Sequence, residues 1–65
     1  MDKTEPLLTT IDLCERYTVP ITTIYEWNHE GKGPRYLKIG RHVRYRLADV
    51  IEWENTRYAA APAVR

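Results

Sequence analysis

Residues 31–46 constrain the fold of this 65-residue chain more than any other stretch. They read Gly-Lys-Gly-Pro-Arg-Tyr-Leu-Lys-Ile-Gly-Arg-His-Val-Arg-Tyr-Arg and contain six of the ten Lys and Arg residues. None of the nine Asp and Glu residues lies among them, although the formal net charge of the whole chain is only +1. The chain therefore combines a strongly cationic segment with acidic residues on either side of it.

Within this segment, apolar residues alternate with polar or charged ones in two short runs, a pattern typical of β-strands. The period of two places Leu37 and Ile39 on one face of the first run, and Val43 and Tyr45 on one face of the second. Gly40 lies between the runs, where a turn is needed. The segment is therefore predicted to form an antiparallel β-hairpin.

The register of this hairpin follows from the requirement that both apolar pairs reach the same core. That requirement places Ile39 opposite Val43 and predicts a three-residue loop at residues 40–42. A two-residue loop at Gly40-Arg41 would form an easy type II′ turn, but it would pair Ile39 with His42 and turn one apolar pair away from the core. We therefore expect the longer loop.

In the predicted register the charged side chains point outward or lie at the hairpin tip. They are Lys38, Arg44 and Arg46 on the outer face, with Arg41 and His42 at the tip. A solubilising edge strand is the alternative interpretation, because charges on a sheet edge discourage aggregation. An edge needs only one or two charges, however, and six of one sign without a counter-charge fit a surface for polyanions better.

Length and composition limit the remaining function classes. Sixty-five residues form one small domain without room for a deep cleft. The only cysteine, Cys14, excludes an internal disulfide, favours a reducing compartment, and is expected to lie in the core. No apolar run approaches the ~18 residues of a membrane span. Cys14, His29 and His42 fall in three different predicted elements, so we expect no enzyme, metal site or cofactor.

Two short helices precede the hairpin. Thr9 begins the first, with Asp12 placed to complete a capping box, and its apolar face is expected to comprise Ile11, Leu13, Cys14 and Tyr17. Pro20 suits the start of the second helix, at residues 21–30, and Gly31 suits its end. In this second helix Ile24 and Trp27 are predicted to face inward.

Two helices joined by a three-residue turn form a helix-turn-helix, whose second helix is the usual reader of the DNA major groove. The other sides of this helix carry polar residues: Thr22, Thr23, Tyr25, Glu26 and His29. Hydroxyl groups there can bind phosphates or base edges, and Glu26 can accept from a cytosine amino group. A solvated charge for Glu26 and partial packing for Tyr25 remain alternatives.

A third helix is predicted at residues 47–58, where Leu47, Val50, Ile51, Glu54 and Tyr58 recur at three- and four-residue steps. Its apolar members are expected to pack over the first helix and the hairpin. The complete order predicts a small α+β fold, a winged helix-turn-helix, at residues 6–58. Residues 1–5 and 59–65 are expected to be flexible ends. An Arg-rich wing can lie along phosphates or enter a minor groove.

Several short motifs then suggest a family. They are Leu7-Leu8-Thr9, Leu13-Cys14, Val19-Pro20, Thr23-Ile24-Tyr25-Glu26-Trp27, Gly33-Pro34, Lys38-Ile39-Gly40-Arg41-His42-Val43-Arg44-Tyr45 and Leu47-Ala48-Asp49-Val50. Their order resembles small winged-helix proteins related to the mercury-resistance-type (MerR-like) regulators, notably bacteriophage excisionases and AlpA-like prophage regulators. The sequence departs from that family at Thr18, often Gly, and at Pro20, often Ser. We therefore expect a less tight turn and no side-chain cap on the second helix.

The resemblance implies a recombination directionality factor in the cytoplasm of a bacterial host. Such proteins bind adjacent sites in attachment-site DNA beside further copies of themselves, bend the DNA, and direct a phage integrase toward excision. In this chain Thr22, Thr23, Tyr25, Glu26 and His29 would enter or flank the major groove. The cationic segment would hold the backbone or minor groove through Lys32, Arg35, Lys38, Arg41, His42, Arg44 and Arg46.

Two alternatives remain open at this point. A prophage transcriptional regulator of the AlpA-like or MerR-like type would use the same fold. Dimeric regulators of this kind carry a long coiled-coil helix after the winged domain, and this sequence shows no heptads. A protein-interaction module is the second alternative, in which Arg57 and Tyr58 of the last helix, with the tail, would contact an integrase.

Overall fold

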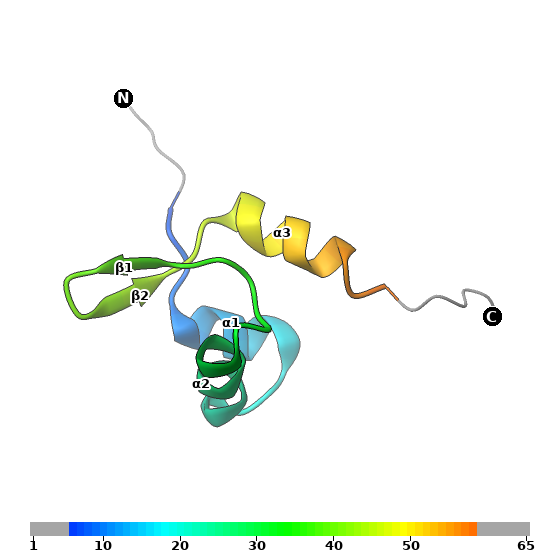
Figure 1. Cartoon of the computed structure of the whole chain (residues 1–65), viewed down its shortest axis with the longest axis horizontal. Helices are drawn as coiled ribbons and strands as arrows, with labels where there is room; N and C mark the ends of the chain where they lie inside the picture. Colours follow the sequence, from blue (N-terminus) through cyan, green and yellow to red (C-terminus); the bar gives the residue numbers. More distant parts are fainter. Residues whose placement is uncertain (1–5, 59–65) are drawn as a thin grey trace.

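The computed structural model describes residues 6–58, so the two predicted flexible ends lie outside the described residues. The elements follow one another as three helices with a hairpin between the second and the third (Figure 1). They are α1 (Thr10–Tyr17), α2 (Ile21–Glu30), β1 (Leu37–Ile39), β2 (His42–Arg44) and α3 (Leu47–Asn55). This arrangement is a winged helix-turn-helix, as predicted, and the hairpin with its loop, residues 37–44, is called the wing below.

The start of α1 confirms the predicted capping box. The Thr9 hydroxyl accepts from the Asp12 N–H at 3.0 Å, and the Asp12 carboxylate accepts from the Thr9 N–H at 2.8 Å. Both bonds satisfy backbone donors that have no partner within the helix. The first helix therefore begins where a purely local signal predicts it.

The turn between α1 and α2 uses a strained backbone. Thr18 adopts the left-handed conformation, with φ 58° and ψ 50°, which costs a non-glycine residue roughly 1 kcal/mol. The turn is nevertheless closed, because the Val19 N–H donates to the Cys14 carbonyl at 3.1 Å. Pro20 occupies the N-cap of α2 and makes no side-chain capping bond, so the predicted loss of a cap is confirmed.

The predicted hairpin register is wrong. The strands pair Leu37 with Arg44, Lys38 with Val43, and Ile39 with His42, which leaves Gly40-Arg41 as a two-residue loop. Gly40 has φ 63°, the conformation that glycine adopts most easily in such turns. The prediction failed because it assumed that both apolar pairs are buried. Only one is, because the wing projects from the body on the side away from α3 (Figure 1).

A backbone pairing at the base of the wing replaces the predicted contact between apolar pairs. Tyr45 exchanges both of its backbone hydrogen bonds with Leu8, each at 2.8 Å. The segment that leads into α1 thereby extends the hairpin by one isolated bridge. This bridge holds the Tyr45 side chain in the core, where it is completely buried.

The core is formed by one fully buried residue from each helix and one from the base of the wing. These residues are Leu13, Ile24, Tyr45 and Val50. Trp27 and Cys14 pack against them as predicted. Ile11 does not, because 57% of it is exposed, and this part of the predicted apolar face of α1 is therefore wrong.

The last helix also differs from its prediction. It ends at Asn55 rather than at Tyr58, because the Thr56 hydroxyl donates to the Trp53 carbonyl at 2.6 Å and the Arg57 N–H bonds three residues back, to Glu54. Val50 faces the core. Leu47 and Ile51 are 40% and 44% exposed, so these two residues of the predicted apolar stripe are not packed away.

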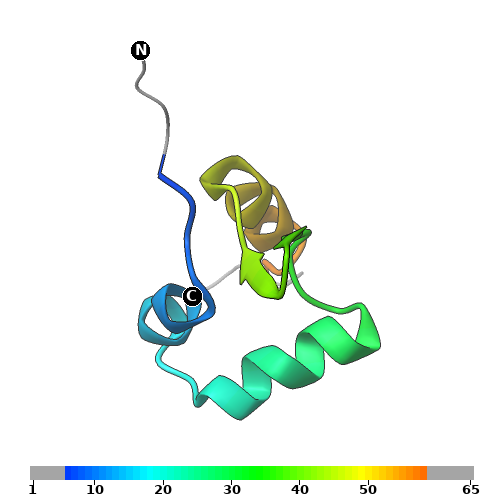
Figure 2. The same ribbon diagram turned by 90° about the vertical axis from the view of Figure 1, so that its left-hand side faces the viewer.

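Three aromatic residues, one from each helix, join the helices beside the core. The rings of Tyr17, Trp27 and Trp53 have centroids 5.1–5.8 Å apart in all three pairs. Aromatic pairs at such distances stabilise by about 0.5–1.5 kcal/mol beyond the area that they bury. This cluster fixes α2 against the rest of the fold. Figure 2 shows α2 along one edge of the molecule, with the wing and α3 above it.

Candidate nucleic-acid interface

The outer face of α2 presents a continuous polar stripe. Thr22, Tyr25, Glu26 and His29 are all exposed and lie at successive three- and four-residue steps. They share this face because Ile24 and Trp27 turn the opposite face into the core. Tyr25 is 56% exposed, which favours an exposed side chain over the alternative of partial packing. Thr23 is half-buried at the edge of the stripe.

The link between α2 and the wing holds Lys32 and Arg35 beside acidic neighbours. Lys32 Nζ lies 3.4 Å from a Glu30 carboxylate oxygen, and an Arg35 guanidinium nitrogen lies 4.0 Å from Asp49. Both cations are exposed, so these contacts offset their charge only in part. Lys32 and Arg35 are consequently weaker candidates for phosphate contacts than the cations of the wing.

The wing carries four cations at its strands and flanks. Lys38, Arg41 and Arg46 are exposed and Arg44 is half-buried, with one guanidinium nitrogen donating to the Val43 carbonyl at 2.8 Å. Among residues 6–58, no carboxylate oxygen lies within 4.0 Å of a charged nitrogen of these four side chains. Their positive potential is therefore not cancelled locally within this part of the chain.

The two-residue loop changes which wing side chains share a face. Lys38 lies on the same side as Val43, whereas Arg44 lies on the opposite side with Ile39 and His42. The prediction that Lys38 and Arg44 point outward together is therefore wrong. The wing projects from the body, so its tip is open (Figure 1). Lys38 and Arg41 lie beside or at the tip, whereas Arg44 and Arg46 lie toward the base of the wing.

Comparison with known families identifies the family to which the chain belongs. A family described as a helix-turn-helix domain matches residues 7–58, which are 52 of the 65 residues. The chain belongs to this helix-turn-helix family. The family binds DNA and includes AlpA-like and excisionase-like proteins, so the resemblance found in the sequence is confirmed at this level. No curated protein matches the chain.

In this helix-turn-helix protein, a buried tyrosine connects the wing to α2. The Tyr45 hydroxyl accepts from the Asn28 side-chain amide of α2 at 2.8 Å, and its ring lies against Tyr36 at 6.1 Å between centroids. The position of α2 relative to the wing is therefore held by a contact between side chains 17 residues apart. Sequence reasoning missed Asn28, because an isolated polar residue on a helix gives no local signal of its partner.

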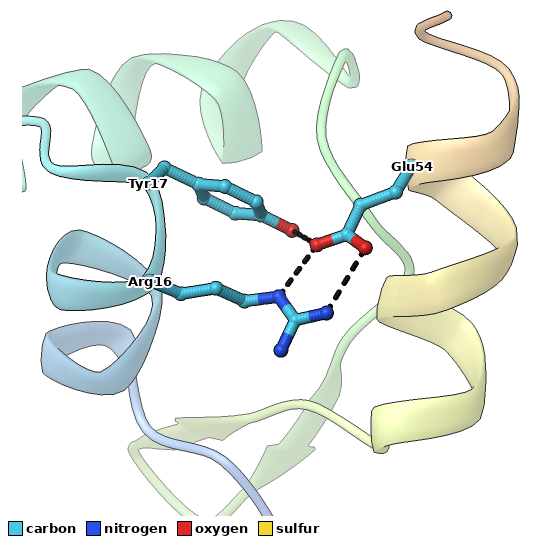
Figure 3. A network of polar contacts seen from close by, with 3 residues as sticks. All are labelled: Arg16, Tyr17 and Glu54. Atoms are coloured by element: carbon cyan, nitrogen blue, oxygen red, sulfur yellow. Dashed lines mark hydrogen bonds and ion pairs between the residues drawn. The ribbon is translucent and has the colours of Figure 1, made fainter.

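A carboxylate of α3 connects that helix to the C-terminal end of α1 (Figure 3). Glu54 accepts two hydrogen bonds from the Arg16 guanidinium, at 2.5 and 3.0 Å, and one from the Tyr17 hydroxyl at 2.6 Å. The bonds from Arg16, followed by that from Tyr17, lower the pKa of Glu54 to about 2. Burial, together with the bond to Glu54, raises the pKa of Tyr17 to about 12. The bond to Glu54 also raises the pKa of Arg16.

This network was not predicted either. Glu54 fell within the apolar stripe of the last helix, and Arg16 gave no signal in its own helix. The pair lies 38 residues apart in sequence, and charges on two helices reveal their partners only after the helices are packed. The network supports the helix-turn-helix and belongs to its framework, away from the polar stripe of α2.

Among residues 6–58, a shallow hollow of about 320 Å³ lies between the end of α2 and the base of the wing and is lined in part by Trp27, Arg35 and Tyr36. Among residues 6–58, no three His, Cys, Asp or Glu side chains come close enough to hold a metal ion. Within the same residues, no helix has the length and apolar character needed to cross a membrane.

Proposed function

We propose that this protein is a phage excisionase, a DNA-architectural factor that acts on attachment-site DNA. It binds adjacent sites beside further copies of itself, bends the duplex, and directs a phage integrase toward excision. The proposal adds a role in recombination to the DNA binding that the family shares.

The observation that carries DNA binding in this proposal is the distribution of charge. Four cations surround the wing without a carboxylate nearby among the described residues, while α1 and α3 carry acidic side chains. Lys and Arg side chains that neutralise phosphates supply most of the affinity of a small DNA-binding module. The wing therefore supplies the grip, through Lys38, Arg41, Arg44 and Arg46, with His42 at its tip and Lys32 and Arg35 at its base.

The exposed stripe of α2 supplies the sequence preference. Thr22, Tyr25, Glu26 and His29 enter the major groove, and Thr23 contacts its edge. A carboxylate there favours cytosine, because it can accept a hydrogen bond from the cytosine amino group. Replacement of Glu26 by alanine is expected to relax base preference at one position with little change in the salt dependence of binding. Glu52→Ala, which removes an exposed carboxylate of α3, is the matched control and should leave base preference unchanged.

The role in recombination is tested by footprinting and bend measurement on phage attachment-site DNA. We expect protection of neighbouring short repeats together with a bend. In a reaction with the cognate integrase, addition of the protein should raise the excision product and lower the integration product. Protection of one isolated operator, with no effect on recombination, would contradict the proposal and favour the AlpA-like or MerR-like transcriptional regulator instead.

A further inference from the structure

The wing exposes an apolar side chain at its tip, among its cations. Ile39 is 50% exposed and lies opposite His42, directly before the Gly40-Arg41 turn. Leu37, two residues earlier on the same face, is half-buried and lies opposite Arg44. A narrow apolar strip therefore runs along one face of the wing toward its tip.

The fold itself does not use this exposure. The register that packs the half-buried Val43 against the core turns Ile39 to the opposite face of the wing, and Ile39 is not among the residues that pack against the core. An exposed apolar residue alone is ordinary on protein surfaces. On a sheet edge, however, it favours aggregation. Its position between cations therefore points to a partner that is apolar in its middle and anionic at its margins.

The minor groove of duplex DNA has this chemistry. Its margins are phosphates, its walls are sugar carbons, and its width of about 6 Å admits a narrow projection such as one hairpin edge. Proteins that bend DNA through this groove insert apolar side chains between base steps and partly unstack them. The wing combines cations for the margins, Lys38, Arg41 and Arg44, with one exposed apolar side chain, Ile39, directly before its turn.

The exposed apolar residues of α3 provide a contrast within the same chain. Ile51 is exposed to a similar degree as Ile39, but it is followed by the exposed and acidic Glu52, whereas the exposed Leu47 follows the cation Arg46. A carboxylate beside an apolar patch opposes the approach of phosphates. The combination that suits DNA is therefore found at Ile39 and is absent at Ile51.

We propose that Ile39 enters the minor groove, partly unstacks one base step, and is a principal cause of the DNA bend. This inference rests on the proposed DNA-binding function and adds to it a contact that carries no charge. The cations of the wing supply affinity that depends on salt, whereas Ile39 supplies bending and a share of affinity that salt does not change.

The test compares Ile39→Ala with Ile51→Ala on one duplex that contains a bound site. Affinity is measured by fluorescence anisotropy at several salt concentrations, and bending by energy transfer between dyes at the duplex ends. Ile39→Ala should weaken binding about tenfold. It should also reduce the bend and leave the slope of log K against log salt unchanged. Ile51→Ala should match the unchanged protein in all three quantities.

A second variant and a second probe test whether Ile39 inserts between bases or only stabilises the wing. Ile39→Met keeps a long apolar side chain and should preserve the bend. With 2-aminopurine placed at the base step that Ile39 is proposed to unstack, the fluorescence of this base should rise on binding of the unchanged protein and of Ile39→Met. It should not rise on binding of Ile39→Ala. Circular dichroism confirms that each variant is folded.

Other results would overturn the inference. If Ile39→Ala binds and bends DNA like the unchanged protein, Ile39 does not enter the groove. If that variant instead loses only its binding to integrase or to further copies of itself, the strip is a protein-docking surface. If the unchanged protein shows no salt-dependent affinity for duplex, the proposed function itself fails, an outcome distinct from both others.

Discussion

At the residue scale, Glu54 has the carboxyl group whose pKa is shifted most among residues 6–58. Its three hydrogen bonds come from Arg16 and Tyr17, so one side chain of α3 satisfies two side chains of α1. A bidentate Arg–carboxylate pair is stronger than a single surface contact. Partial exposure weakens it, since 38% of the Arg16 side chain and 28% of the Glu54 side chain remain accessible. The contact is therefore a moderate clamp between the first and the last helix.

Replacement of Glu54 by glutamine is expected to destabilise the fold by about 1–2 kcal/mol, because the charge is lost while the shape is kept. In a domain of this size, the melting temperature should fall by about 4–16 °C. Thermal unfolding followed by circular dichroism measures the change. Glu52→Gln, an exposed glutamate on the same helix, is the control and should change the melting temperature little.

The same contact predicts the response to acid. Folding lowers the pKa of Glu54 from its ordinary 4.5 to about 2, so the unfolded chain binds this proton more readily than the folded one. The stabilisation from Glu54 is complete above pH 4.5 and is lost as pH falls toward 2. Urea unfolding between pH 6 and pH 2 should therefore show a steeper loss of stability in the unchanged protein than in Glu54→Gln. Parallel curves for the two proteins would show that Glu54 does not carry this pH dependence.

Tyr45 carries the contact between the wing and α2. Its hydroxyl accepts a hydrogen bond from Asn28 Nδ2, and Asn28 Oδ1 is buried with no hydrogen-bond partner within residues 6–58. Tyr45→Phe would leave the whole amide unpaired and should destabilise the fold by about 1–2 kcal/mol. A double-mutant cycle with Asn28→Ala measures the coupling directly. Independent, additive effects of the two substitutions would contradict the contact.

At the element scale, the turn of the helix-turn-helix stores strain at Thr18. A glycine adopts the left-handed conformation without the steric penalty that Thr18 bears, although it loses more backbone freedom on folding. Thr18→Gly is therefore expected to stabilise the fold by about 0.5–1 kcal/mol in urea unfolding. Thr18→Ala keeps the penalty and should give no such gain. A Thr18→Gly variant less stable than the Thr18→Ala variant would show that the turn is not strained.

The elements also show which features the sequence could predict. Helix starts, the capping box at Thr9 and the inward position of Ile24 depend on neighbours within one turn, so local spacing predicts them. The hairpin register depends on how much of the wing contacts the core. Tyr45 and Val43 do so, and Ile39 lies beyond the body. The alternation of apolar and polar residues identifies the strands, but it does not reveal which of the apolar residues are buried by the rest of the fold.

The candidate interface was predictable to a similar extent. The cations of residues 31–46 were visible as a run of one charge sign, and the polar face of α2 followed from the position of its apolar residues. The partners of Arg35, of Asn28 and of the Lys32 carbonyl were not visible, because each lies on an element that only tertiary packing brings near. Lys32 is a clear case, since its carbonyl accepts from the Trp53 indole 21 residues away.

At the scale of the whole molecule, a nearly neutral chain separates its charges in space. The wing, with its cations, projects on one side, and α3, with its carboxylates, lies on the other (Figure 1). A formal net charge of +1 therefore understates the positive potential around the wing. Bulk properties such as the isoelectric point do not reveal this separation, whereas the salt dependence of DNA binding does.

If about five phosphates are neutralised, log K should fall against log salt with a slope of roughly −4 to −5. Arg41→Gln combined with Arg44→Gln removes two wing cations and should make this slope shallower by about 2, with weaker binding at low salt. Arg57→Gln is the matched control. It removes an arginine that stacks on Trp53, 5.1 Å from the ring centre, and donates to the Lys32 carbonyl at 3.0 Å. Circular dichroism should show all variants folded. An equal change of slope for each charge removed in the wing variant and in the Arg57 variant would mean that net charge, rather than the wing, holds the DNA.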